Sequence, residues 1–257
     1  MKLDLDRRAS ISYNSFSQKA RVLTETWVDK EIYCPNCGFE ELTKYLNNRP
    51  VADFVCKRCQ EDFELKSKKT VFGEKIVDGA YRTMLDRLAS LNNPNLFLLR
   101  YDATALRVSE FFVIPKHFLV PAAIEKRKPL SPAARRAGWV GCNILLSRIP
   151  SSGRIFLIKD DQAVNKKTVL RDRKKTLFLR EEKETLARGW LLDVMTCVEA
   201  IGKPVFTTAD IYQYEGRLAR LHPDNKHVKD KIRQQLQRLR DKGYLEFYGK
   251  GRYRLAL

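Results

Sequence analysis

Two pairs of cysteines, Cys34 with Cys37 and Cys56 with Cys59, constrain this chain more than any other feature of its sequence. Two residues separate the members of each pair, and 18 residues lie between the pairs. A tight turn with this spacing presents two thiolates to one ion, and two such turns complete a tetrahedron. The pattern predicts a zinc site with a structural role, because four cysteines leave no open position for water.

The other two cysteines, Cys142 and Cys197, stand alone and are expected to be small core residues. Paired cysteines that bind a metal favour a reducing compartment over an oxidising one. The polar start MKLDLDRR lacks the apolar core of a secretory signal, and no stretch approaches the ~18 apolar residues that span a bilayer. We therefore expect a cytoplasmic protein without membrane association.

The charge of the chain points to a polyanionic partner. Its 49 lysines and arginines exceed its 31 aspartates and glutamates, which gives a net charge of +18. Nucleic acid is the partner that such a field most often attracts; an anionic membrane and a merely solubilising surface are the alternatives. The excess extends over the whole chain, so more than one part could contact nucleic acid.

Asp53, Glu64 and Lys66 form a second pattern, which overlaps the cysteines. Residues two apart on a strand share a face, so Glu64 and Lys66 would project together while Phe63 and Leu65 face the core. Two carboxylates can hold Mg²⁺ against a scissile phosphate, and a lysine can orient the attacking water or help to deprotonate it. The alternative is three solvated side chains, since acidic residues near such a triplet are common on exposed strands.

Other hydrolytic chemistries lack their residues. The three histidines, His117, His222 and His227, have neither metal-ligand nor triad spacing. The chain also has no glycine-rich phosphate loop.

Periodicity in the first part of the chain predicts a mixed sheet flanked by helices, an α/β (α+β) arrangement. Amphipathic helices are expected at 17–30, behind a serine cap, and at 78–91; strands are expected at 63–68, 95–101, 110–115 and 152–159. The charged run at 171–175 is expected to be a solvated face or a linker. We expect one domain over 1–182 and a second over 183–257.

Residues 115–143 have the composition of a loop with a basic surface. Trp139 lies there between two glycines and close to Arg135 and Arg136. The tryptophan could either lie over the core or contact bases in a DNA groove, with the two arginines on phosphates or guanines.

The second domain is expected to be a winged helix-turn-helix. Its pattern predicts helices at 185–201, 206–218 and 228–243, then two short strands joined at 249–251. Val228, Ile232, Leu236 and Leu239 would form the inner face of the third helix. Side chains with donors and acceptors for base edges would form its outer face: Lys226, Asp230, Arg233, Gln234 and Gln237.

Long, uncommon strings in the same order make the whole chain resemble the DpnI family of methyl-directed type II restriction endonucleases. They include CPNCG, PVADF, ELKSK, IEKRKPL, ARRAGWVGCNI and KDKIRQQLQRLRDKG. The resemblance implies a PD-(D/E)xK nuclease domain with a zinc site and a C-terminal winged helix. It also implies Mg²⁺-dependent cleavage of double-stranded DNA at GATC containing N6-methyladenine, and recognition by both domains.

By position, the resemblance gives catalytic roles to Asp53, Glu64 and Lys66, with Mg²⁺ on the two carboxylates and zinc on the four cysteines. Two residues separate Pro50 from Asp53, where the superfamily name suggests adjacent residues. We expect the protein to act as a monomer. Two other functions remain open: a zinc-containing winged-helix regulator without nuclease activity, and a nuclease that ignores methylation.

Overall fold

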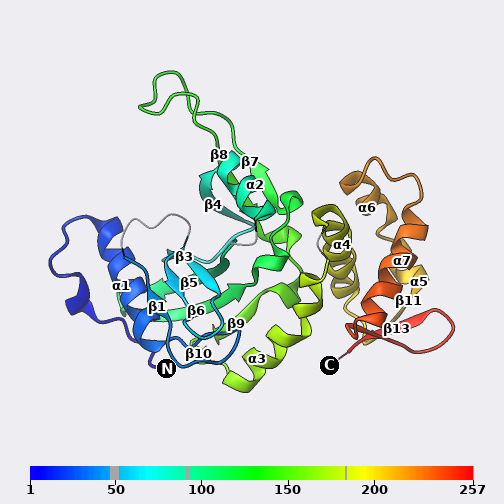
Figure 1. The fold of residues 1–257 in the computed structure, drawn as a ribbon, viewed down its shortest axis with the longest axis horizontal. Helices are drawn as coiled ribbons and strands as arrows, with labels where there is room; N and C mark the ends of the chain where they lie inside the picture. The colour runs from blue at the N-terminus through cyan, green and yellow to red at the C-terminus, as the bar shows by residue number, and fades with distance from the viewer. Residues whose placement is uncertain (47–51, 91–92, 183, 257) are drawn as a thin grey trace.

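A computed structural model describes residues 1–46, 52–90, 93–182 and 184–256 (Figure 1). Pro50 of the sequence motif lies outside these ranges. The largest element is a seven-stranded mixed sheet with the order β1-β2-β3-β5-β6-β9-β10, in which β3 and β5 are parallel and the other neighbours are antiparallel. Its strands are β1 (Thr43–Lys44), β2 (Phe54–Val55), β3 (Asp62–Lys68), β5 (Asn95–Asp102), β6 (Arg107–Ile114), β9 (Ile155–Lys159) and β10 (Gln162–Ala163).

The central strand β5 is buried on both faces because successive side chains point to opposite sides of a sheet. Phe97 and Leu99 pack in one core with residues of α1 (Phe16–Glu31) and α3 (Lys166–Lys175). Leu96 and Leu98 belong to a second core on the other face. The predicted mixed sheet with flanking helices is confirmed.

A second sheet, of order β4-β8-β7, carries a long hairpin. Its antiparallel strands are β4 (Lys75–Ala80), β7 (Ile124–Lys126) and β8 (Gly141–Leu145). The connection between β7 and β8 reaches away from the rest of the molecule (Figure 1). Strand β4 leads directly into α2 (Tyr81–Ala89), so the predicted helix at 78–91 was wrong in its first turn, which is the end of β4.

The last part of the chain is helical with a small sheet of order β11-β13-β12. Its helices are α4 (Thr185–Ile201), α5 (Thr208–Tyr212), α6 (Glu215–Leu221) and α7 (Val228–Asp241), and its strands are β11 (Val205–Thr207), β12 (Leu245–Phe247) and β13 (Arg252–Leu255). The predicted single helix at 206–218 is instead β11, α5 and α6. A capping box between Thr207 and Asp210 starts α5, as the threonine cap predicted.

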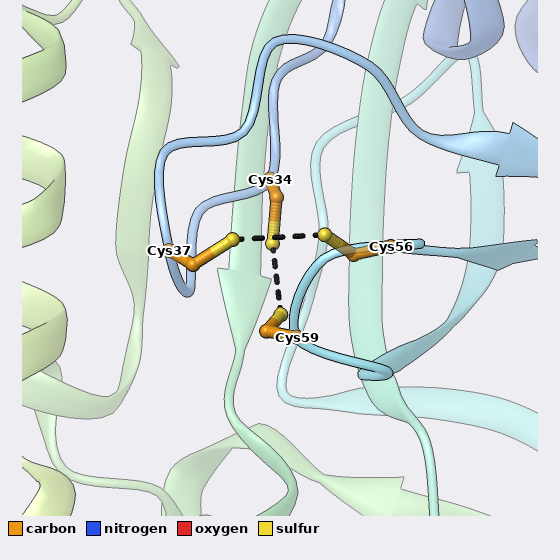
Figure 2. Close-up of side chains that lie close together, drawn as sticks. All are labelled: Cys34, Cys37, Cys56 and Cys59. Atoms are coloured by element: carbon orange, nitrogen blue, oxygen red, sulfur yellow. Dashed lines mark hydrogen bonds between the residues drawn. The ribbon is translucent and has the colours of Figure 1, made fainter.

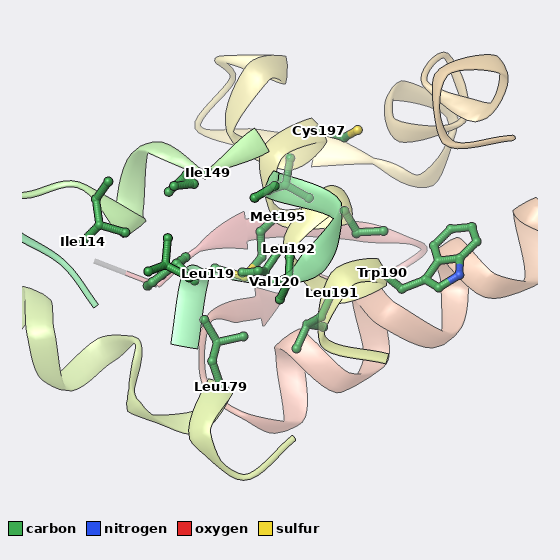
Figure 3. Close-up of a cluster of buried hydrophobic side chains, with 14 of the residues drawn as sticks. Ile114, Leu119, Val120, Ile149, Leu179, Trp190, Leu191, Leu192, Met195 and Cys197 are labelled. Atoms are coloured by element: carbon green, nitrogen blue, oxygen red, sulfur yellow. The ribbon is translucent and has the colours of Figure 1, made fainter. Parts of the chain in front are cut away.

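Helix α4 joins the two parts of the molecule through one apolar core. Leu191, Leu192 and Met195 of α4 lie in the same cluster as Leu119 and Ile149 (Figure 3). The helix packs on the short 3-10 segments η3 (Pro121–Ala123) and η4 (Leu146–Arg148). The remaining 3-10 segments are η1 (Arg7–Ser10), η2 (Lys116–Phe118), η5 (Ser151–Gly153) and η6 (Leu177–Arg180).

Polar contacts reinforce this apolar junction. Asp193 of α4 accepts hydrogen bonds from Arg148 and His222, each at 2.9 Å. The Glu199 carboxylate accepts from the Ser151 backbone N–H at 2.5 Å and from the Tyr244 hydroxyl at 2.6 Å. In the described ranges, no helix has the length and apolar character needed to cross a membrane.

Candidate active site and metal-binding cluster

The four paired cysteines converge, as predicted. Their sulfurs point toward one another from two turns of the chain, and their ligand atoms all lie within 4.8 Å of one another (Figure 2). The Sγ–Sγ distance is 3.6 Å for both Cys34–Cys59 and Cys37–Cys56. Zinc–thiolate bonds of about 2.3 Å imply tetrahedral edges of about 3.8 Å. The cluster therefore fits a zinc ion without rearrangement.

Each cysteine turn has a backbone suited to a metal knuckle. The Gly38 N–H donates to the Cys34 carbonyl and the Gln60 N–H donates to the Cys56 carbonyl, both at 2.8 Å. Gly38 and Gln60 have φ angles of +75° and +57°, a region that glycine adopts without strain and other residues rarely do. The first turn follows α1, and the second connects β2 to β3. A bound zinc would thus fasten α1 to the β2–β3 hairpin.

The two arms of that hairpin carry the predicted catalytic residues. Asp53 immediately precedes β2, and its backbone N–H donates to the Phe63 carbonyl at 2.9 Å. Glu64 and Lys66 lie on β3, and the neighbouring Phe63 is fully buried in the core. The sequence separation of Asp53 from Glu64 is thus closed by strand pairing, with the cysteine turn at the end of the hairpin.

Asp53, Glu64 and Lys66 line one cavity of about 560 Å³. The Asp53 Oδ2 accepts from the Leu65 N–H at 2.7 Å. Burial raises the pKa of Asp53; the Leu65 hydrogen bond opposes this effect, and the charges of Glu25 and Glu64 add to it. A divalent cation would relieve this repulsion between carboxylates.

The ammonium of Lys66 lies between two carboxylates. Its Nζ is 2.6 Å from the Glu64 Oε1 and 2.6 Å from the Asp78 Oδ1. Burial disfavours the protonated lysine, but the charges of Glu64 and Asp78 outweigh burial and raise the pKa of Lys66. The lysine is therefore held as a cation in this arrangement.

Sequence reasoning missed four further charged residues of the cavity: Arg21, Glu25, Asp78 and Arg87. Glu25 comes from α1 and is 4% exposed, with its carboxylate paired to Arg21 at 2.6 Å and to Lys44 at 2.7 Å. Arg87 comes from α2, and its Nη2 is 2.9 Å from the Glu64 Oε2. In the sequence, a glutamate of an amphipathic helix that faces a cavity cannot be distinguished from one that faces solvent. Only the fold shows that Glu25 lines the cavity.

The carboxylates suit an open magnesium site rather than a closed cage. Among the described residues, the cysteines form the only cluster of three or more Cys, His, Asp or Glu side chains gathered within 4.8 Å. Magnesium keeps several waters and takes one or two protein carboxylates together with phosphate oxygens. Asp53 and Glu64 could supply those two carboxylates, and the cavity has space for the rest.

A buried cation adjoins the cysteine cluster, in the segment expected to be solvated. Arg173 of α3 is 1% exposed, so the expectation that 171–175 is only a solvated face or linker was wrong. Burial and the charge of Arg180 lower the pKa of Arg173 to about 10, although the charges of Glu61, Cys34 and Cys59 act in the opposite direction. Four thiolates around a divalent zinc carry a net charge of 2−, and such a cation would balance half of it.

Trp139 lies on the β7–β8 hairpin, outside both apolar cores of the described chain. Its ring is partly exposed, and the Arg136 guanidinium carbon lies 4.7 Å from the ring centroid. Arg135 and Arg136 are exposed. The ring lies on the hairpin outside the two apolar clusters, and its contact with bases stays a prediction.

The two faces of α7 are as predicted. Val228, Ile232, Leu236 and Leu239 are buried. The outer set is exposed: Lys226, Asp230, Arg233, Gln234 and Gln237. Arg233 pairs with Asp230 and donates to the Tyr212 hydroxyl at 3.0 Å. Lys226 lies in the turn before α7 rather than on the helix.

The solitary cysteines are core residues, as expected, and Trp190 also lies in the core. Cys142 and Cys197 have no exposed surface, and Trp190 is 7% exposed. The Trp190 ring stacks on His222 with a centroid distance of 3.7 Å.

Comparison with known families divides the chain in two. Residues 1–182 match a family model described as DpnI, the Dam-replacing family. Residues 186–255 match one described as the Dam-replacing HTH domain. The two matches together cover nearly the whole sequence.

Proposed function

The chain belongs to the DpnI, or Dam-replacing, family, and from this membership we propose that it is a methyl-directed type II restriction endonuclease. Its substrate would be double-stranded DNA at GATC sites that contain N6-methyladenine, and it would act as a monomer. Residues 1–182 would form a PD-(D/E)xK nuclease domain, and residues 183–257 a winged-helix domain. Family membership implies a restriction endonuclease; the site, the methyl requirement and the metal are our proposals.

The observation that carries the proposal is the meeting of Asp53, Glu64 and Lys66 in one cavity. They come from the two arms of a hairpin, and the pKa of Asp53 is raised in part by the neighbouring Glu25 and Glu64 carboxylates. Three solvated surface side chains would not be gathered and partly buried in this way. The alternative function, a DNA-binding regulator without nuclease activity, does not explain why these three side chains line one cavity.

In the proposed mechanism, Asp53 and Glu64 hold Mg²⁺, which would polarise the scissile phosphate and lower the pKa of a bound water. The Leu65 N–H fixes the Asp53 carboxylate through its Oδ2. Lys66, held as a cation, is suited to orient the water and to stabilise the negative charge that develops on the phosphate. This role fits better than the alternative, in which the lysine removes a proton.

Recognition would involve two surfaces. Arg135, Arg136 and Trp139 on the β7–β8 hairpin would contact DNA beside the cavity, since β4 of the same sheet lines it through Asp78 and Gly79. The exposed face of α7 would enter the major groove, with Arg233, Gln234 and Gln237 toward the bases and Lys226 toward a phosphate.

Methyl dependence requires more than one contact. The N6 methyl group adds a small apolar surface in the major groove, worth about 1 kcal/mol when buried. A pocket shaped around the methyl group is left with a void when the group is absent, which increases discrimination. Two methylated strands, or two reading domains, would multiply the effect.

The test uses plasmids from a methylating and a non-methylating host, incubated with Mg²⁺ and either the wild type or Asp53→Ala. We expect the wild type to cut only the methylated plasmid and the variant to cut neither. No cutting by the wild type would leave the DNA-binding regulator as the function. Equal cutting of both plasmids would remove the methyl requirement and keep the nuclease.

A further inference from the structure

Asp78 occupies the active-site cavity without being part of the recognised motif. It lies on β4, in the second sheet, and its side chain is 4% exposed. Its Oδ1 accepts from the Lys66 Nζ at 2.6 Å, the same distance that separates Nζ from Glu64. A buried carboxylate is costly unless it has a partner, and this partner is the proposed catalytic lysine.

The geometry points to Asp78 as the positioning residue of Lys66. This inference rests on the proposed nuclease function. Lysine has a flexible four-carbon stem, and a compact ammonium with three donors. Asp78 and Glu64 accept two of these donors, which leaves the third for a water or phosphate oxygen in the cavity. When Glu64 turns to a metal, Asp78 alone keeps the ammonium in place.

Strand β4 holds Asp78 firmly enough for this task. Asp78 pairs with Cys142 of β8 and Ala80 pairs with Gly141, so Gly79 forms a bulge between them. The Cys142 thiol donates to the Gly79 carbonyl at 3.4 Å. Bulges redirect the side chains beside them, and this one lies where Asp78 meets the cavity. Just beyond β4, α2 supplies Arg87 to Glu64, so one continuous segment contacts both Lys66 and Glu64 of β3.

The same strand links the lysine to the extended hairpin. Gly141, which faces Ala80, lies under the Trp139 ring: a Cβ added there would come within 2.8 Å of two ring carbons. The Tyr81 N–H donates to the Val140 carbonyl at 3.0 Å. The residue that orients Lys66 therefore belongs to the sheet that bears the proposed DNA-contacting loop.

Asp78→Asn tests the inference, because the amide keeps the shape and an acceptor but loses the charge. On methylated plasmid with Mg²⁺, we expect kcat to fall by about 10- to 100-fold while KM and DNA affinity in Ca²⁺ stay within twofold. Asp193→Asn is the matched control, since it removes a similarly buried carboxylate that contacts Arg148 and His222 at the α4 junction. It should lower Tm and leave kcat unchanged.

A second measurement is independent of cleavage. Mild acetylation followed by mass spectrometry reports how freely each lysine amine reacts, and Lys44, paired with Glu25 beside the same cavity, is the internal reference. Asp78→Asn should raise the labelling of Lys66 several-fold relative to Lys44, and Asp193→Asn should not. Unchanged Lys66 labelling, or an unchanged kcat, would overturn the positioning role. Failure of the wild type to cut would instead reject the nuclease proposal.

Discussion

At the scale of single residues, the sequence predicted the part of the site that lies on one short stretch. Glu64 and Lys66 are two residues apart on a strand, so strand periodicity predicts that they share a face. Asp53 is brought to them by the pairing of β2 with β3, and the sequence linked it to them only through the pattern of two acidic residues with a lysine and the family resemblance. Glu25, Asp78 and Arg87 come from three other elements. No spacing rule connects them to β3, because only tertiary packing brings them to the cavity.

Asp53→Asn should abolish cleavage and raise stability together. Because the folded protein raises the pKa of Asp53, ionisation costs stability as the pH rises above the unfolded-state pKa, and the full cost is present above the folded-state pKa. Without magnesium at pH 7, the variant should have a higher Tm than the wild type. The rise should be roughly 2–4 °C for each kcal/mol gained in the free energy of unfolding. The gain should shrink as the pH falls and Asp53 is protonated in both states. Cleavage should fall by more than roughly 100-fold. A lower Tm in the variant would contradict the stability cost of the ionised Asp53 carboxylate.

His117 should make stability depend on pH between 7 and 5. Burial, then the charges of Arg173 and Arg180, lower the pKa of this histidine well below 6.5. The unfolded chain therefore binds a proton that the folded chain does not, and stability falls as the pH drops below about 6.5, by up to about 1.4 kcal/mol per pH unit. Urea unfolding at several pH values should show a smaller slope in His117→Gln. The exposed His227→Gln should keep the wild-type slope; equal slopes in all three proteins would exclude His117.

At the scale of elements, amphipathic periodicity identified α1 and α7, because each has one clear apolar face. It failed where a short strand adjoins a helix. Strand β4 runs into α2 at Ala80, and β11 into α5 at Thr207, so helical spacing was extended across residues that are in fact paired with β8 and β13. Pairing partners distant in sequence leave no local signal.

The cysteine turn at the end of the β2–β3 hairpin should make zinc a condition for the active site. Cys56→Ser should lose zinc, cleavage and more than roughly 4 kcal/mol of stability, because the turn that joins Asp53 to Glu64 loses its anchor. A strong zinc chelator should do the same to the wild type. Metal analysis, cleavage and urea unfolding provide the measurements. The control variant, Cys197→Ser, changes a buried cysteine outside the cluster, and this protein should retain zinc. Full cleavage by zinc-free protein would refute the prediction that the active site requires zinc.

The outer face of α7 should determine affinity for DNA. Arg233→Ala should weaken binding to methylated GATC duplexes by about 1–3 kcal/mol, measured by fluorescence anisotropy at fixed salt. Arg240→Ala changes another exposed arginine of α7, at its last turn, and should have a smaller effect. Equal losses in both variants would indicate general charge attraction rather than docking of this face.

At the scale of the whole molecule, the two parts of the chain that match the two family models share one apolar core. The sequence predicted a boundary near 182, and composition gave no sign that α4 would insert its leucines among Leu119, Ile149 and their neighbours. A helix that is apolar on several sides, such as α4, is expected from its sequence to be buried within its own domain. Which partner it buries against is set by the three-dimensional arrangement alone.

Because of this shared core, the protein should unfold as one cooperative unit. Calorimetry should show a single transition. Leu192→Asp should lower the Tm of that transition and decrease the free energy of unfolding by roughly 4 kcal/mol or more. Leu186→Asp, on the same helix at an 83% exposed position, should have little effect. Two separate transitions in the wild type would show that the domains are energetically independent.

The junction at α4 also bears on how such a protein can change over generations. A winged helix replaced by one from an unrelated regulator would lack the side chains that fill the space beside Leu119 and Ile149, and the nuclease part would be left with an uncovered apolar surface. Substitutions on α4 and on the segments beneath it should therefore be inherited in compensating pairs. The recognition module of this molecule can diversify on its outer helix face, while its inner helix stays matched to the nuclease that it was inherited with.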